Sequence, residues 1–265
     1  MNLRIKRYTY EEIASERSPR VLKAEKLGEA EIHVWFRALD QQVPNANALF
    51  ELLSADERER ARRYRFDEHR NEFILTRAAL RILLGFYLET FPEQLAFSYS
   101  AQGKPSLEKD AAALCFNVSH THGLAALAFG RGCEIGVDVE KLRPECDATK
   151  LAQRFFSASE REAISSLSGR ALHEAFFRCW TRKEAFIKAK GGGLSIPLDQ
   201  FDVSIDEGRP AALLGTRPDP AEASRWMLHD LPVKEGYAGA LAFSVRAMER
   251  RKPASDRNIP NFVSS

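Results

Sequence analysis

The sequence lacks most features that mark secreted, membrane or zinc-binding proteins. Its 265 residues contain four cysteines, at positions 115, 133, 146 and 179, with no CxxC pair among them. This spacing argues against a zinc site and against a disulfide-stapled secreted fold. The N-terminus has no apolar run of the signal-peptide kind, and no apolar stretch reaches the roughly 18 residues that span a bilayer. We therefore expect a reduced, cytoplasmic protein without a membrane segment.

The sequence also lacks a strong excess of charge of either sign. The formal net charge is +2, with 44% hydrophobic and 29% charged residues, as in an ordinary soluble globular protein. A global cationic field that would attract nucleic acid is therefore not expected. The basic residues are nevertheless uneven, because Arg58, Arg60, Arg62, Arg63 and Arg65 lie close together. Such a cluster suits a local anion site.

Hydrophobic periodicity predicts alternating strands and helices. The alternation of Ile32, Val34 and Phe36 predicts a half-buried strand over 31–39. Ser54 can cap an arginine-rich helix, and apolar residues at helical spacing predict a second helix over about 68–87. Two further strands are expected at 114–120 and 123–130.

The second half of the chain repeats this order. Residues 134–142 resemble 31–39, FNVS at 116–119 is echoed by FDVS at 201–204, and ALAF at 126–129 recurs at 240–243. We interpret these echoes as an internal duplication. The predicted fold class is α+β, with two similar halves that form a pseudo-dimer around a cleft. The expected units are an N-terminal half (1–133), a C-terminal half (134–248) and a polar tail (249–265).

The two halves differ in charge at one strand. Where the first half has Trp35 and Arg37, the second has Asp138 and Glu140. Residues i and i+2 of a strand point to the same face, so both carboxylates project together. Neighbouring carboxylates raise each other's pKa unless a cation lies between them, and such oxygen ligands suit Mg²⁺ or Mn²⁺. An isolated pair of this kind is also typical of the solvent-exposed face of an edge strand.

A third acid supports the metal interpretation. Residues 180–190 predict a helix that ends at three glycines, 191–193. Glu184 and Lys188 are four residues apart and therefore lie on one helical face. Alone, Glu184 and Lys188 are typical of a solvated ion pair. Together with Asp138 and Glu140 they favour a metal–phosphate site. Phe155 and Phe156 are most simply core aromatics.

Four motifs carry a resemblance to a known family. FNVSH (116–120), IGVDVEK (135–141) and WTRKEAFIKAKGGGLSIPL (180–198), with GKP at 103–105, closely resemble the Sfp-type 4′-phosphopantetheinyl transferases. The similarity covers roughly 54–205 and keeps the motif order. It implies a monomeric enzyme with its active site between two related halves. The implied reaction moves the phosphopantetheine arm of coenzyme A onto a serine of an apo acyl or peptidyl carrier protein and releases 3′,5′-ADP.

The resemblance also implies roles for individual residues. Asp138, Glu140 and Glu184 would bind Mg²⁺, or else Mn²⁺, and Glu184 and Lys188 would be catalytic. The serine would be activated by Glu184 or by a metal-bound water, and the sequence leaves that choice open. Family members often carry a basic residue where this chain has Glu57, so the resemblance leaves Arg60 and Arg63 as the candidates for the 3′-phosphate contact. The residues expected to contact coenzyme A are Arg60, Arg63, Gly103, Lys104, Pro105, Asn117, Ser119, His120, Lys183 and Lys188.

Two other functions were weighed against this one. A Mg²⁺-dependent nucleic-acid enzyme is disfavoured by the near-zero net charge and by the lack of a recognised binding module. A non-catalytic carrier-protein or coenzyme A binding relative is disfavoured because all three carboxylates and Lys188 are present. The sequence does not identify the carrier or its pathway. Apolar residues near Phe155 and Leu167 are a candidate docking surface.

Overall fold

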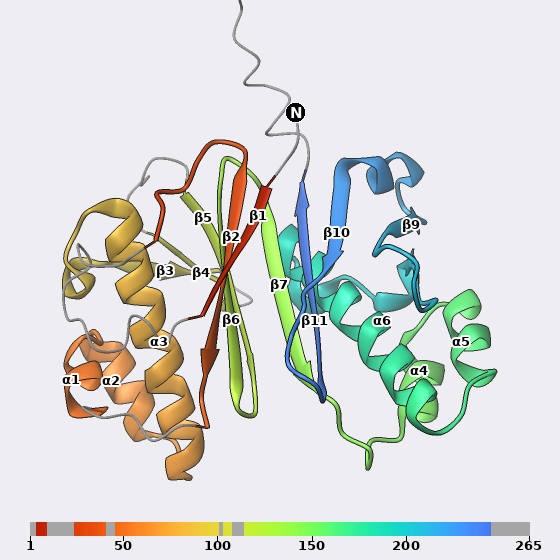
Figure 1. The fold of residues 1–265 in the computed structure, drawn as a ribbon, viewed down its shortest axis with the longest axis horizontal. Helices are drawn as coiled ribbons and strands as arrows, with labels where there is room; N and C mark the ends of the chain where they lie inside the picture. Colours follow the sequence, from red (N-terminus) through yellow and green to blue (C-terminus); the bar gives the residue numbers. More distant parts are fainter. Residues whose placement is uncertain (1–3, 10–23, 41–45, 101–102, 108–113, 245–265) are drawn as a thin grey trace, which may run out of the picture.

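Two β-sheets pack face to face in the middle of the structure, and one long helix covers the outer face of each (Figure 1). The structure is a computed structural model that describes residues 4–9, 24–40, 46–100, 103–107 and 114–244. The predicted α+β class and the arrangement of two similar halves are confirmed. The predicted tail at 249–265 lies outside the described residues.

The first sheet has four strands in the order β1-β2-β6-β5. β1 (Arg4–Thr9) runs parallel to β2 (Glu31–Ala38), whereas β2, β6 (Leu124–Arg131) and β5 (Leu114–Thr121) are antiparallel neighbours. The helices of this half and its two short strands are α1 (Ala46–Glu51), α2 (Ala55–Arg62), α3 (Asp67–Leu88), η2 (Pro92–Gln94), β3 (Phe97–Tyr99) and β4 (Pro105–Leu107).

The second sheet has three antiparallel strands in the order β10-β11-β7. They are β10 (Trp226–Asp230), β11 (Tyr237–Ser244) and β7 (Ile135–Lys141). The other elements of this half are α4 (Ala148–Phe155), α5 (Ala158–Ser165), α6 (Gly169–Lys190), η3 (Gly193–Ser195), η4 (Leu198–Gln200), β8 (Phe201–Val203), β9 (Leu213–Thr216) and η5 (Pro220–Arg225). In the part of the chain that is described, no helix has the length and apolarity to cross a bilayer.

Side-chain alternation on β2 and β7 builds the layer between the sheets. Ile32 and Val34 of β2 pack there against Val137 and Val139 of β7, in one buried cluster. Trp35 of β2 faces α3 instead, within a separate cluster. Because successive residues of a strand point to opposite faces, the acidic positions of β7 face α6. The predicted correspondence between 31–39 and 134–142 therefore holds for the strands β2 and β7 that these segments contain.

The other two echoes do not mark equivalent positions. FNVS lies on β5 in the four-stranded sheet, whereas FDVS spans β8, which pairs with β9 in a small separate sheet. The two ALAF segments lie on β6 and β11 but show opposite faces, since Ala126 packs between the sheets and Ala240 packs against α6. An offset of one residue in a strand exchanges its two faces, so the sequence match is out of register.

Side chains of β5 connect the two sheets. β7 is an edge strand of its sheet, so its outward N–H groups need acceptors. The Val137 N–H donates to Asn117 Oδ1 (2.8 Å), the Val139 N–H to Ser119 Oγ (3.3 Å), and the Lys141 N–H to a third β5 side chain. These bonds hold the FNVSH strand of the first half beside the acidic strand of the second.

Candidate active site

Four charged side chains from β7 and α6 meet beside β5. Asp138 is 3% exposed, and its Oδ1 accepts hydrogen bonds from Lys188 Nζ (2.6 Å) and Ser119 Oγ (2.9 Å). Lys188 Nζ also donates to Ser119 Oγ (2.9 Å). Glu140 and Glu184 are partly buried on the same two elements. The structure thus brings together the acids of the two predicted motifs and the lysine expected to contact phosphate.

This cluster holds more negative charge than its surroundings neutralise. Burial raises the pKa of Glu184 to about 7, and the nearby Asp138 carboxylate adds to the shift. Burial, and then Asp138, also raise the pKa of Glu140. The second oxygen of Asp138, Oδ2, is buried and has no hydrogen-bond partner. A buried, unpartnered carboxylate oxygen near two further acids is the environment expected of a cation site.

The three acids do not converge as tightly as a closed metal site. The trio whose ligand atoms all lie within 4.8 Å of one another, among the described residues, is Glu68, Glu72 and His122. Glu72 there accepts a hydrogen bond from the Gly123 N–H (3.1 Å) and so holds the turn between β5 and β6. Glu68 and His122 form an exposed ion pair at 3.0 Å. We assign this second trio a structural role.

A cavity of about 460 Å³ lies beside Glu184 and Lys188 and is lined by both halves. Lys104 Nζ donates to the Lys188 carbonyl (2.6 Å), and burial lowers the Lys104 pKa below its ordinary value. The first half contributes Gly103, Lys104, Pro105, Asn117 and Val118 to the lining, and the second contributes Glu184, Ile187, Lys188, Gly191, Gly193 and Ser195. The predicted GKP turn therefore lies at the same cavity as Glu184 and Lys188 of α6.

The other residues expected to contact coenzyme A are less closely grouped. His120 is exposed at the end of β5, and its pKa is lowered by partial desolvation and by the nearby charges of Lys188 and Arg60. Arg60 lies with its guanidinium 5.1 Å from the centre of the Phe73 ring. Arg63 is exposed and contacts Glu59 of its own helix at 3.8 Å. His120 and Arg60 thus lie on the side of Lys188, whereas no described contact places Arg63 there.

The acid at position 57 has a structural explanation. Glu57 is 2% exposed and binds Arg81 at 2.6 Å and Arg77 at 3.4 Å. It also accepts a hydrogen bond from the Ser54 N–H (3.0 Å), which caps α2. A buried carboxylate with these partners joins α2 to α3.

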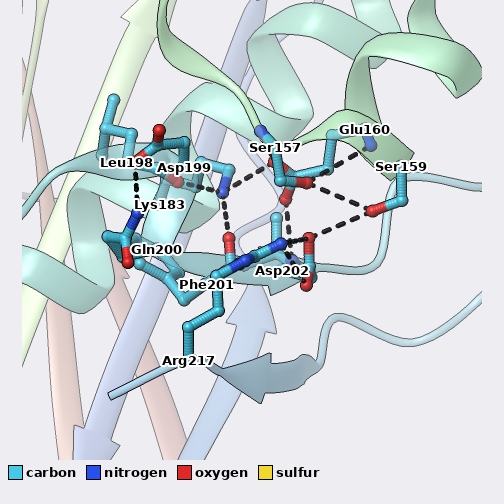
Figure 2. Close-up of polar contacts among 11 residues, drawn as sticks. Ser157, Ser159, Glu160, Lys183, Leu198, Asp199, Gln200, Phe201, Asp202 and Arg217 are labelled. Atoms are coloured by element: carbon cyan, nitrogen blue, oxygen red, sulfur yellow. Dashed lines mark hydrogen bonds and ion pairs between the residues drawn. The ribbon is translucent and has the colours of Figure 1, made fainter.

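The expectation that Lys183 contacts coenzyme A is wrong. Lys183 is 0% exposed, and its ammonium group is surrounded by Glu160 and by the carbonyls of Leu198 and Phe201 (Figure 2). Its position one residue before Glu184 places it on a different face of α6. Phe156, predicted to be a core aromatic, is 1% exposed and confirmed as such.

One residue of the site was missed by sequence reasoning. Thr121 Oγ1 accepts a hydrogen bond from the Lys141 N–H (3.2 Å) and donates to Glu140 Oε2 (3.4 Å). It is the third polar residue in the alternating series that begins with Asn117 and Ser119 on β5. That period of two, continued one step beyond FNVSH, is the signal that could have identified it.

Comparisons with known proteins find relatives over most of the chain. Two family models match the chain, "4′-phosphopantetheinyl transferase, N-terminal" over 41–130 and "4′-phosphopantetheinyl transferase superfamily" over 134–242. The chain is 38% identical over 214 residues to the 4′-phosphopantetheinyl transferase HetI of Nostoc sp., covering 80% of this chain and 87% of HetI. It is 31% identical over 155 residues to Sfp of Bacillus subtilis, covering 58% of this chain and 67% of Sfp. A holo-(acyl-carrier-protein) synthase from Bacillus anthracis, solved with coenzyme A, is similar at a TM-score of 0.34 and 23% identity, over 42% of this chain and 94% of that one.

Proposed function

This chain belongs to the 4′-phosphopantetheinyl transferase family, and from that premise we propose that it is a Mg²⁺-dependent enzyme acting on carrier proteins. It transfers the phosphopantetheine arm of coenzyme A to a serine hydroxyl of an apo acyl or peptidyl carrier protein. The serine oxygen forms a bond to the β-phosphorus of the pyrophosphate. The bond from that phosphorus to the bridging oxygen breaks, and 3′,5′-ADP leaves.

The observation that carries this proposal is the buried Asp138 carboxylate. Its Oδ1 is held by Lys188 and Ser119, while its Oδ2 has no partner although it is buried. The donors around it, Glu140 and Glu184, offer only carboxylate oxygens, which suit Mg²⁺ or Mn²⁺. We propose that Asp138, Glu140 and Glu184 hold the ion. The chemistry supplied by the bound ion is charge neutralisation at the pyrophosphate.

The chain's own residues supply the rest of the site. The Lys188 ammonium, already at the acid cluster, donates to phosphate oxygens, and Lys104 holds the Lys188 carbonyl from the other half. Preorganised donors of this kind stabilise the charge that develops during phosphoryl transfer. Glu184 has two carboxylate oxygens, so one can hold the ion while the other accepts the serine proton. His120 and Arg60 are proposed to contact the nucleotide phosphates.

The site also supports activity as a monomer. Lys104, Asn117 and Ser119 come from the first half, and Asp138 and Lys188 come from the second half of the same chain. Both sets meet within one molecule, so no partner subunit is needed to complete the cavity. We propose a boundary between the halves near residue 133 and, from the reduced cysteines, a cytoplasmic location.

The direct test is transfer itself. The purified protein is incubated with coenzyme A, Mg²⁺ and an apo carrier, and the carrier is weighed by intact-mass spectrometry. Fatty-acid, polyketide and nonribosomal-peptide carriers are compared in parallel. We expect one carrier to gain the mass of one phosphopantetheine, and we expect EDTA to abolish the gain.

A matched pair of variants tests the metal site. Asp138→Asn is expected to lower the transfer rate about 1000-fold, because it removes a charged ligand from the reacting centre. Asp206→Asn removes an exposed carboxylate of the same half and should transfer at the wild-type rate. Transfer that is insensitive to EDTA and to Asp138→Asn would refute the metal role. A folded protein that binds coenzyme A but modifies no carrier would favour the non-catalytic alternative.

A further inference from the structure

Lys183 is a fully buried cation whose three N–H groups all have acceptors. Its Nζ lies 2.7 Å from Glu160 Oε2, 2.7 Å from the Leu198 carbonyl oxygen and 2.6 Å from the Phe201 carbonyl oxygen. Nζ also lies 4.3 Å from the centre of the Phe201 ring. An ammonium group has three donors, so the coordination in Figure 2 is complete. No donor is left for a ligand.

Glu160, the partner of Lys183, is also fully engaged. Its Oε2 accepts from the Ser157 N–H (3.0 Å), and its Oε1 accepts from the Val203 N–H (2.9 Å). The ion pair therefore joins α5, α6 and the segment 198–203. Apolar residues of similar volume often replace a buried ion pair without loss of stability. An apolar pair, however, cannot hold neighbouring carbonyl and N–H groups in a fixed orientation, because it forms no hydrogen bonds.

The segment held by this pair continues directly from a wall of the cavity. The preceding loop, 191–197, begins at Gly191, whose φ of 75° ends α6, and passes through Gly193, with φ of 53°. Gly191, Gly193 and Ser195 line the 460 Å³ cavity beside Glu184 and Lys188. Glycines lose the most conformational freedom on ordering, so keeping a loop with three of them in one conformation is costly, and an anchored end reduces that cost.

We propose that Lys183 is a positioning residue: together with Glu160 it anchors segment 198–203 and so keeps loop 191–197 in place as a wall of the coenzyme A cavity. One helix thus carries two kinds of basic residue. Lys188 faces the cavity, and Lys183 holds the far end of the loop that encloses it. The coenzyme part of this inference rests on the proposed function, whereas the anchoring part does not.

Amide hydrogen exchange of the ligand-free protein tests the anchoring. Lys183→Met keeps a side chain of similar length without its charge. We expect amides in 193–203 to exchange about a hundredfold faster or more, because a buried pair is broken and the segment opens locally. Amides of β6 and α3 should exchange as in the wild type. The matched control is Arg170→Met, which removes a basic residue from the opposite end of the same helix, where it pairs with Glu174 at 2.6 Å. It should leave exchange in 193–203 unchanged.

Steady-state kinetics tests the consequence for the site. With the loop ordered for only about a tenth of the time, the KM for coenzyme A should rise about tenfold. The KM for the carrier should not change, and kcat should fall less than the KM rises. Loss of overall stability alone would lower the amount of active enzyme and would leave both KM values unchanged.

A double variant keeps the inference testable if Lys183→Met does not fold. Lys183→Met/Glu160→Gln removes both charges, which should restore stability, while the two carbonyls still lack a donor. We expect fast exchange in 193–203 and a raised KM for coenzyme A to persist. Wild-type exchange and KM in the double variant would overturn the proposal. Fast exchange throughout the chain, or failure of both variants to fold, would also overturn it. Either result would mean that the ion pair stabilises the whole fold and not this segment in particular. If the wild type transfers nothing, the proposed function fails, and exchange still decides the anchoring.

Discussion

Helix α6 lies so close to β7 at Gly136 that the structure excludes any side chain there. A Cβ at this position would lie 2.1 Å from the Ala185 carbonyl oxygen and 2.4 Å from the Ala189 nitrogen. Both are backbone atoms of α6, which cannot turn aside as a side chain can. Gly136→Ala must therefore push α6 away from β7 by about 1 Å, and overpacking of this kind costs about 1–3 kcal/mol or more.

The displacement separates the two groups of acids. Asp138 lies two residues along β7 from Gly136, whereas Glu184 and Lys188 lie on the part of α6 that must move. A misplacement of about 1 Å at a reacting centre can cost about a hundredfold in rate. We expect Gly136→Ala to lower the urea midpoint and to lower kcat for carrier modification about a hundredfold in the protein that remains folded. Urea unfolding and intact-mass kinetics measure the two effects separately.

Gly215→Ala is the matched control. Gly215 lies on β9, its φ is not positive, and no atom lies within 4 Å of the added Cβ. We expect a change within about 0.5 kcal/mol and wild-type transfer. If Gly136→Ala proves as stable and as active as Gly215→Ala, close contact between α6 and β7 is not what positions the acids.

Three further predictions concern side chains of the first half. Tyr87→Phe removes the oxygen that accepts from Trp35 Nε1 (2.8 Å), and the buried N–H left behind should lower the unfolding free energy by about 1–3 kcal/mol in urea denaturation. Burial lowers the pKa of His33 below its ordinary 6.5, so the unfolded chain takes up that proton first as the pH falls. Stability should therefore decrease below pH 6.5 with a steeper slope in the wild type than in His33→Gln, and equal slopes would contradict this. Thr121→Val removes a hydrogen bond to Glu140 and the acceptor of the Lys141 N–H, and we expect kcat/KM to fall about tenfold and the unfolding free energy to fall by about 1–3 kcal/mol.

Periodic patterns in the sequence predicted the local elements and the faces of the acidic strand. The strand at 31–39, the helix at about 68–87 and the shared face of Asp138 and Glu140 depend on spacing alone, which a sequence displays directly. Lys183 could not be assigned in this way. Its burial depends on Glu160 and on carbonyls of a later segment, which only the tertiary fold brings together.

The register of the internal repeat also could not be predicted from the sequence. Four matching letters in ALAF suggested equivalent positions on β6 and β11, yet Ala126 and Ala240 face opposite sides of their sheets. Small apolar residues suit either face of a strand that is covered on both sides, so the sequence does not indicate which residues point to which face. On β7 charged residues alternate with valines, and there the face to which each side chain points could be predicted.

The position of a strand within its sheet explains why one half carries the acids. β2 lies between β1 and β6, and at the position that matches Asp138 it has Trp35, which is enclosed against α3. β7 is the edge strand of its own sheet and borders β5, whose Ser119 and Asn117 reach across to it. A carboxylate on β7 therefore reaches the boundary between the halves, where Lys188 and Ser119 contact it and the first half contributes Lys104 to the cavity. A carboxylate in place of Trp35 would be buried among apolar side chains without a cation. Two similar halves thus offer one suitable position for the acids, and the edge location of β7 determines which half has it.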